Sequence, residues 1–155
     1  MKGVVVSIYT CAAASAALGS VAEATLEAGR GIVGDRYYLG DGTFSAKLAG
    51  KPDFEITLIE QEEVDRFNRE QGLSLDAGAL RRNVVTRDVR LNDLVGIRFR
   101  VGKAILEGIR LCEPCAHLAG LADPRVLPAL VHRAGLRARI VSGGVIYPGD
   151  SITAA

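Results

Sequence analysis

The sequence has little net charge and no long apolar run, and both absences limit what the protein can bind. Its formal net charge is +1, so no overall field would draw the chain to nucleic acid or to an anionic membrane. No apolar run approaches the roughly 18 residues that a membrane-spanning helix needs. We therefore expect no nucleic acid and no membrane among its partners.

Cysteine and lysine are also scarce. The three cysteines are an odd number, and a chain of 155 residues is long enough to bury a core without disulfide cross-links. We therefore expect free thiols and a cytoplasmic location, although residues 2–18 somewhat resemble a signal peptide and residues 3–9 equally resemble a first strand. Only four of the 19 basic residues are lysines. The rest are arginines, whose planar guanidinium groups suit phosphate and carboxylate, although a genomic bias toward arginine would explain most of them.

Several familiar signatures are missing as well. The chain has no Ser-His-Asp order, no phosphate-binding loop and no dinucleotide-binding fingerprint. No repeat, linker or low-complexity tract divides it. We expect residues 1–155 to form a single domain.

Glycine, by contrast, is abundant. The 18 glycines predict many turns and favour short strands over a helical bundle. Alternation of apolar and polar residues indicates about seven short strands. In one of them, Ile97, Phe99 and Val101 should face the core. The predicted strands lie near residues 3–9, 54–59, 84–86, 97–101, 104–111, 136–142 and 152.

Two helices are predicted between these strands. Residues 60–71 have an amphipathic pattern with Val64 and Phe67 facing inward, and residues 123–135 begin with the Asp-Pro pair that is typical of a helix start. The alanine-rich stretch 11–28 is predicted as a loop or a short helix without a chemical role. Because strands and helices do not alternate in βαβ order, we predict a mainly β, β-barrel-like fold with a few peripheral helices.

The densest group of reactive side chains is Cys112-Glu-Pro-Cys115-Ala-His117. A structural zinc site would need four ligands, and His132 is the only other histidine. A dithiol redox centre would need the C-x-x-C pair to open a helix in a thioredoxin-like fold. A third interpretation is a single thiolate at Cys115, which can attack, carry sulfur or bind a soft metal. An inert buried cysteine is the fourth.

Two other groups could bind an anion through arginine. Arg81, Arg82 and Asn83 lie on a segment predicted to be extended, so one arginine could reach a pocket while the other faces solvent. A solvated surface pair is the alternative. Asp35 and Arg36 are interpreted first as a structural ion pair that braces a turn, ahead of a direct role in catalysis.

Backbone amides could bind an anion as well. Gly143 and Gly144 could offer such amides, and an ordinary turn explains these glycines equally well.

Stretches that follow one another along nearly the whole chain resemble a known family. They are Gly31-Ile-Val-Gly-Asp-Arg-Tyr, Ile56-Thr-Leu-Ile-Glu, Arg81-Arg-Asn-Val-Val-Thr, Leu91-Asn-Asp-Leu-Val-Gly, Cys112-Glu-Pro-Cys115 and Gly143-Gly-Val-Ile-Tyr-Pro-Gly-Asp. In this order they resemble the MOSC domain, which is named for the C-terminal part of molybdenum cofactor sulfurase, and in particular its small stand-alone bacterial members.

The resemblance implies a β-barrel-like fold in which Cys115 is the hallmark cysteine. In related proteins that cysteine is proposed to carry a persulfide to the cofactor, or to ligate molybdenum in enzymes that reduce N-hydroxylated compounds. Cys112 would be a resolving thiol at best. The resemblance also places a basic motif near an anion site. The candidate cofactor-binding residues are Arg81, Arg82, Asn83, Asp35, Arg36, Gly143 and Gly144.

These observations lead to three functional hypotheses. The first is a protein that binds molybdenum cofactor (molybdopterin), carries sulfur as a Cys115 persulfide, or both. Arg82 and Arg81 would anchor the cofactor phosphate, and His117 would donate a proton. The second is a molybdenum-cofactor-dependent reductase of N-hydroxylated compounds, which would need an external electron-transfer reductase because no flavin or nicotinamide motif is present. The third is a non-catalytic module for cofactor binding or docking.

The resemblance also bears on cofactors and partners. Pyridoxal phosphate belongs to the separate N-terminal domain of the full sulfurases, so none is expected in this chain. Sulfur would then come from a cysteine desulfurase-type donor. Assembly as a homodimer is left open.

Overall fold

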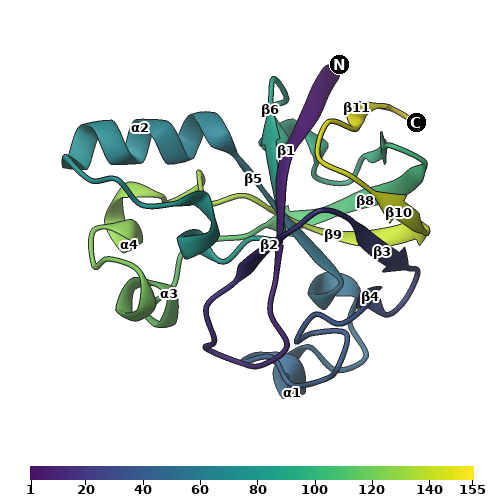
Figure 1. The fold of residues 1–155 in the computed structure, drawn as a ribbon, viewed down its shortest axis with the longest axis horizontal. Helices are drawn as coiled ribbons and strands as arrows, with labels where there is room; N and C mark the ends of the chain where they lie inside the picture. Colours follow the sequence, from purple (N-terminus) through teal and green to yellow (C-terminus); the bar gives the residue numbers. More distant parts are fainter.

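Seven strands close into a barrel in the computed structural model, which describes residues 1–155 (Figure 1). Around the barrel the order is β11-β7-β8-β9-β5-β6-β1, and β1 closes the ring by pairing with β11. Closure leaves these seven strands without a free edge. They are β1 (Lys2–Thr10), β5 (Ile56–Glu60), β6 (Val84–Arg87), β7 (Arg98–Val101), β8 (Ala104–Leu111), β9 (Leu136–Ser142) and β11 (Ser151–Ala154).

The inside of the barrel is filled by a cluster of 20 buried apolar residues. Phe99 on β7, Leu106 on β8, and Ile56 and Leu58 on β5 are all completely buried. Successive residues of a strand point to opposite faces, so the alternation in the sequence places every second side chain in this core. The predicted mainly β, barrel-like fold is confirmed.

A small second sheet borders the barrel. β3 (Ala24–Glu27) pairs with both β4 (Gly31–Ile32) and β10 (Gly144–Ile146), and β2 (Gly19–Val21) pairs with β1. The prediction of a loop or short helix for residues 11–28 was therefore wrong, because two strands lie within this stretch. These strands are specified by partners elsewhere in the chain and not by an alternating pattern of their own.

Helices α2, α3 and α4 lie together on one side of the barrel, and α1 lies apart from them (Figure 1). Helices α2, α3 and α4 pack against the barrel strands in a second cluster of 11 buried residues, which includes Val64 and Phe67 of α2, Leu118 of α3 and Val126 of α4. None of the helices is both long enough and apolar enough to cross a membrane. The helices are α1 (Ser45–Leu48), α2 (Gln61–Gln71), α3 (Ala116–Leu121) and α4 (Val126–Ala129), with short 3-10 helices η1 (Pro52–Phe54), η2 (Ala77–Leu80) and η3 (Leu91–Leu94).

Helix α2 confirms one prediction and corrects another. Its extent and its inward-facing Val64 and Phe67 are as predicted, and Gly72 ends it in a left-handed conformation with φ of 66°. However, α2 connects β5 to β6, which pair in parallel. A parallel pair needs a crossover connection, so this part of the chain is a βαβ unit, and the expectation of no such unit was wrong.

The second predicted helix is much shorter than expected. α4 covers only residues 126–129. Its hydrogen bonds continue past Pro128, with the N–H of Leu130 donating to the backbone oxygen of Val126, and the helix ends before His132, which adopts a left-handed conformation with φ of 62°. The Asp123 carboxylate accepts a hydrogen bond from the backbone N–H of Arg125 at 2.9 Å, which forms a local turn in place of a long helix.

The hairpin of β7 and β8 is found as predicted, with Gly102 and Lys103 between the two strands. Phe99 and Val101 are buried, but Ile97 is 48% exposed. The strand begins only at residue 98, so the predicted inward position of Ile97 was wrong.

Gly108 on β8 provides a test of how tightly the barrel is packed. A Cβ atom at this position would lie 2.0 Å from the backbone oxygen of Leu94, and backbone cannot move aside as a flexible side chain can. We expect Gly108→Ala to lower the free energy of unfolding by about 1–3 kcal/mol, as measured by chemical denaturation. Gly120→Ala is the matched control, because a Cβ there meets nothing within 4 Å. A Gly108→Ala protein as stable as Gly120→Ala would contradict the close contact.

Candidate functional site

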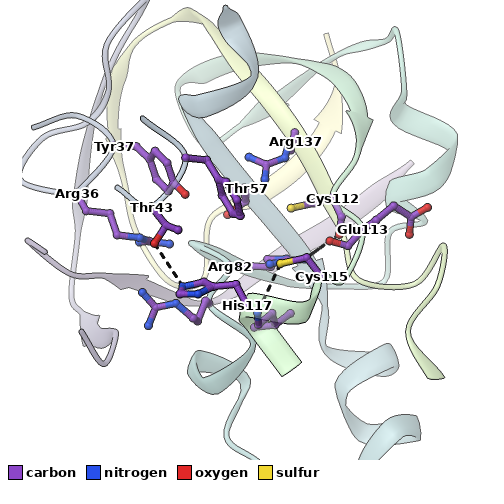
Figure 2. A pocket seen from close by; sticks show the side chains of 13 residues that line it. Arg36, Tyr37, Thr43, Thr57, Arg82, Cys112, Glu113, Cys115, His117 and Arg137 are labelled. Atoms are coloured by element: carbon purple, nitrogen blue, oxygen red, sulfur yellow. Dashed lines mark hydrogen bonds between the residues drawn. The ribbon is translucent and has the colours of Figure 1, made fainter. Parts of the chain in front are cut away.

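A narrow cavity opens beside Cys115, where the loop before α3, strand β9 and the segments after β4 meet (Figure 2). Its volume is ≈ 50 Å³, within ≈ 500 Å³ of empty space that includes the open mouth. Its wall contains sulfur, imidazole and guanidinium groups. These groups belong to Cys112, Cys115, His117, Arg36, Arg81, Arg82 and Arg137.

Cys115 presents its thiol to this cavity. It directly precedes α3 in an extended conformation, and its Sγ accepts a hydrogen bond from the backbone N–H of Leu118 at 3.5 Å. The residue is half-buried, whereas Cys112 is only 1% exposed. The interpretation of an inert, fully buried cysteine therefore fits Cys112 better than Cys115, although Cys112 also contributes to the cavity wall.

Arg82 holds the loop that leads to Cys115. Its side chain is buried, and its guanidinium donates to the carbonyl oxygens of Cys112 and Ala134, both at 2.8 Å, and of Glu113 and Leu80, both at 3.3 Å. These contacts occupy most of its N–H groups. Arg82 was predicted to anchor a phosphate, but its geometry is that of a residue that positions the cysteine loop.

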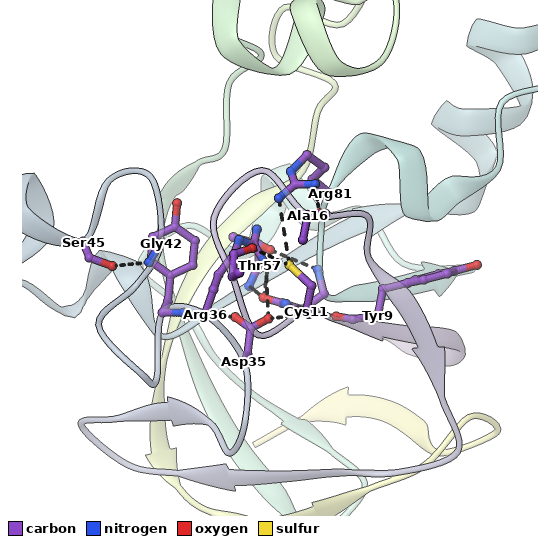
Figure 3. Close-up of polar contacts among 12 residues, drawn as sticks. Tyr9, Cys11, Ala16, Asp35, Arg36, Gly42, Ser45, Thr57 and Arg81 are labelled. Carbon is purple, nitrogen blue, oxygen red and sulfur yellow. Dashed lines mark hydrogen bonds and ion pairs between the residues drawn. The ribbon is translucent and has the colours of Figure 1, made fainter.

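Arg81 was predicted to lie on an extended segment, and this was wrong. It adopts a left-handed conformation with φ of 63° at the end of η2, so it and Arg82 do not simply face opposite sides of a strand. Its guanidinium donates to the backbone oxygen of Ala16 and lies 4.0 Å from Sγ of Cys11 (Figure 3). Burial, and then the positive charge of Arg36, lower the pKa of Arg81. The guanidinium of Arg81 forms hydrogen bonds only to Ala16 and Cys11, so some of its N–H groups remain available to an anion.

Asn83 supports the barrel and does not reach the cavity. Its side-chain oxygen accepts hydrogen bonds from the backbone N–H and the hydroxyl of Thr57, both at 3.1 Å, and its amide donates to the backbone oxygen of Tyr9 at 3.1 Å. All of these contacts join neighbouring strands, and Asn83 is absent from the cavity wall. Its predicted role in cofactor binding finds no geometric support.

Asp35 and Arg36 form the predicted ion pair, with 3.1 Å between Oδ1 and Nη1, and both residues are buried (Figure 3). Asp35 also accepts a hydrogen bond from the backbone N–H of Cys11 at 3.2 Å, so the pair fixes the turn against the end of β1. The guanidinium of Arg36 packs over the Tyr37 ring at 4.9 Å and lines the cavity. Arg36 therefore has both a bracing role and a place in the cationic wall.

His117 faces the same cavity from the first turn of α3 (Figure 2). Its Nε2 lies 3.4 Å from the hydroxyl of Ser15 and 3.3 Å from that of Thr43. Ser15 could not be identified from the sequence, because the alanine-rich stretch around it has no chemical pattern. Only the folded chain brings that stretch over the cavity.

Arg137 could not be identified as a site residue from the sequence either, because the alternation of residues 136–142 indicates only a strand. Its Nη1 donates to the backbone oxygen of Asp53 at 3.2 Å. Its Nε is shielded from solvent and has no hydrogen-bond partner. A buried donor without a partner is rare and costly in proteins, so it is the kind of group that a bound ligand would satisfy.

Two other predictions are not supported. Gly143 and Gly144 do not line the cavity, which touches β9 at Arg137, about 20 Å of extended strand away from Gly143. The glycines instead lie against β3, where Gly144 pairs with Leu26. No three His, Cys, Asp or Glu side chains gather to hold a metal ion, so the residues of a structural zinc site do not come together.

The cavity is strongly cationic. Arg36, Arg81, Arg82 and Arg137 line it, and Glu113 contributes the only carboxylate. That carboxylate points to His132. It accepts a hydrogen bond from the backbone N–H of His132 at 2.7 Å and also contacts the imidazole ring. Positive charge is therefore concentrated around the cavity that Cys115 lines, an arrangement that favours the binding of anions.

The sequence model of the MOSC domain matches residues 45–153, which is more than half of the chain. YuaD from Bacillus subtilis has a similar structure, with a TM-score of 0.83 at 16% identity, covering 98% of this chain and 94% of that one. YiiM from Geobacillus stearothermophilus has a TM-score of 0.76 at 18% identity, covering 99% and 75%. YiiM from Escherichia coli has a TM-score of 0.70 at 19% identity, covering 100% and 70%. At these identities the likeness shows the fold. No curated protein matches significantly.

The different roles of the adjacent arginines can be tested by stability. Arg82→Met would leave the buried carbonyl oxygens of Cys112 and Ala134 without their donor, so we expect the free energy of unfolding to fall by about 3 kcal/mol or more. Arg81→Met removes a half-buried group that holds one loop carbonyl, and we expect a loss of less than about 1 kcal/mol. Urea denaturation of both variants measures the difference. Equal losses would show that Arg82 does not brace the loop.

Proposed function

The chain belongs to the MOSC domain family, and on that premise we propose that Cys115 is the reacting sulfur of a site that binds molybdenum cofactor, carries sulfur as a persulfide, or both. The observation that supports this proposal is the half-buried thiol of Cys115 in a cavity lined by four arginines. A thiolate is a nucleophile that can carry sulfur and is also a soft metal ligand.

The donor set is suited to molybdenum cofactor. Cys115 would be the metal ligand, and Arg81, Arg137 and Arg36 would bind anionic groups such as the phosphate, since the N–H groups of Arg82 are mostly occupied. The buried Nε of Arg137 without a partner is the observation most consistent with a ligand here. When bound, the cofactor would supply a redox-active metal centre, and this chain would supply the thiol and the cationic wall.

Sulfur carrying needs a donor. In this version of the proposal the donor is a cysteine desulfurase-type protein that transfers sulfur to Cys115, and the whole chain acts as one domain. The half-buried position of the thiol in an open-mouthed cavity is compatible with access from outside.

A second candidate function is reduction of N-hydroxylated compounds with molybdenum cofactor and an external reductase. One observation favours it: His117 lines the cavity that Cys115 faces, and cleavage of an N–O bond by reduction consumes protons that an imidazolium can donate. Reduction of a hydroxylaminopurine with an electron donor, measured for wild type and His117→Gln, separates this activity from sulfur transfer.

The ligand role of Cys115 can be tested by metal retention. After reconstitution with molybdenum cofactor and desalting, we expect wild type to retain molybdenum and Cys115→Ser to retain little, because a hydroxyl is a poor ligand for a soft site. Elemental analysis measures the retained metal. Cys11→Ser is the matched control, since it removes another half-buried thiol that does not line the cavity.

Equal amounts of retained molybdenum in wild type and Cys115→Ser would contradict the proposed ligand role of Cys115. The carrier role has its own measurement, which is mass spectrometry of Cys115 after exposure to a sulfur donor. An activity that survives Cys115→Ser unchanged would instead indicate a non-catalytic module for cofactor binding or docking.

A further inference from the structure

The cavity at Cys115 is small compared with the spaces beside it. Its volume is ≈ 50 Å³, and a buried water needs roughly 10–15 Å³ measured in this way. A second cavity, on the Pro114 side of Cys115, has a volume of ≈ 230 Å³. A third, on the far side of Arg81, has ≈ 340 Å³. The narrow cavity therefore suits an anion the size of a few waters, and the wider ones suit larger molecules.

The charges in the narrow cavity exceed what a single negative charge would balance. Arg36 bonds to Asp35, but Arg81, Arg82 and Arg137 form no ion pair with a carboxylate. Arg81 and Arg36 lie close enough for mutual repulsion to lower the pKa of Arg81, after the larger effect of burial. A dianion would relieve this repulsion.

Arg137 supplies the most specific donor. Its Nε is buried without a partner, and its side chain lines both the narrow cavity and the wider one beside Pro114. Cys115 lines the same two cavities. A small anion bound at Arg137 in the narrow cavity would thus leave the thiol open to a larger molecule from the other side.

We propose that the narrow cavity binds thiosulfate, a small dianion with a transferable sulfur, and that Cys115 takes this sulfur from it directly. The inference rests on the proposed role of Cys115 as a sulfur carrier and names a small-molecule donor in addition to a protein. The sulfonate oxygens would accept hydrogen bonds from Arg137 and Arg81. These arginines also offset the repulsion between the dianion and the thiolate.

The step is balanced without an added oxidant or reductant. The Cys115 thiolate attacks the outer sulfur of thiosulfate, and a new S–S bond forms. The old S–S bond breaks, its electron pair leaves with the sulfonate sulfur, and sulfite is released. Cys115 then carries a persulfide anion, which can pass its outer sulfur to cyanide to give thiocyanate and restore the thiolate.

The test measures thiosulfate-dependent persulfide on Cys115 by mass spectrometry, released sulfite, and thiocyanate formed with cyanide. We expect wild type to form one sulfite per persulfide. Arg137→Gln should raise the KM for thiosulfate about tenfold or more, because a charge-assisted hydrogen bond to the dianion is lost. Arg137→Lys should restore part of that loss. Arg90→Gln is the matched control, since Arg90 is exposed and outside the cavity.

Hydropolysulfide, which lacks a sulfonate, serves as the second donor and separates the two proposals. Loading of Cys115 by hydropolysulfide in Arg137→Gln would show that the variant is folded and its thiol reactive, whatever the rate. If hydropolysulfide loads Cys115 and thiosulfate does not, the thiosulfate inference is wrong and the carrier role stands. Equal KM values for Arg137→Gln and Arg90→Gln would also overturn it. If neither donor loads Cys115, the carrier role itself is wrong.

Discussion

The position of Cys115 depends on one buried guanidinium. Arg82 donates to the carbonyl oxygens of Cys112 and Glu113, on the loop before Cys115, and to that of Ala134, just before β9. The carbonyl dipoles replace the hydration that the cation lost on burial, but they do not cancel its charge. These hydrogen bonds therefore fix the cysteine loop to the barrel. Because the carbonyl groups are neutral, the positive charge of Arg82 remains at the cavity.

The positive cavity contrasts with a nearly neutral chain. Elsewhere, several arginines are paired with acids: Glu107 binds both Arg98 and Arg139, and these hydrogen bonds lower the pKa of Glu107. Asp53 binds Arg110 in the same way. Arg81, Arg82 and Arg137 in the cavity form no such pair with a carboxylate, so positive charge remains beside Cys115, where it favours anions.

Much of the barrel could be predicted because local periodicity reports which face of a strand is buried. The hairpin of β7 and β8, strand β9 and helix α2 follow from such patterns. Strands β2 to β4, the parallel pairing of β5 with β6 and the shortness of α4 could not be predicted. Each depends on contacts with distant residues or on a backbone conformation, such as that of His132, which only the folded chain imposes.

The sequence by itself determined that a cysteine follows a proline between a strand and a helix, and it singled out Cys115 as the candidate reacting residue. Only the tertiary structure decided which cations face that sulfur. Arg82 stabilises the loop before Cys115, and Asn83 joins neighbouring strands by hydrogen bonds. Arg137, from a strand distant in sequence, lines the cavity. The physical reason is that a side chain's partners are set by barrel closure, which joins segments that no local pattern relates.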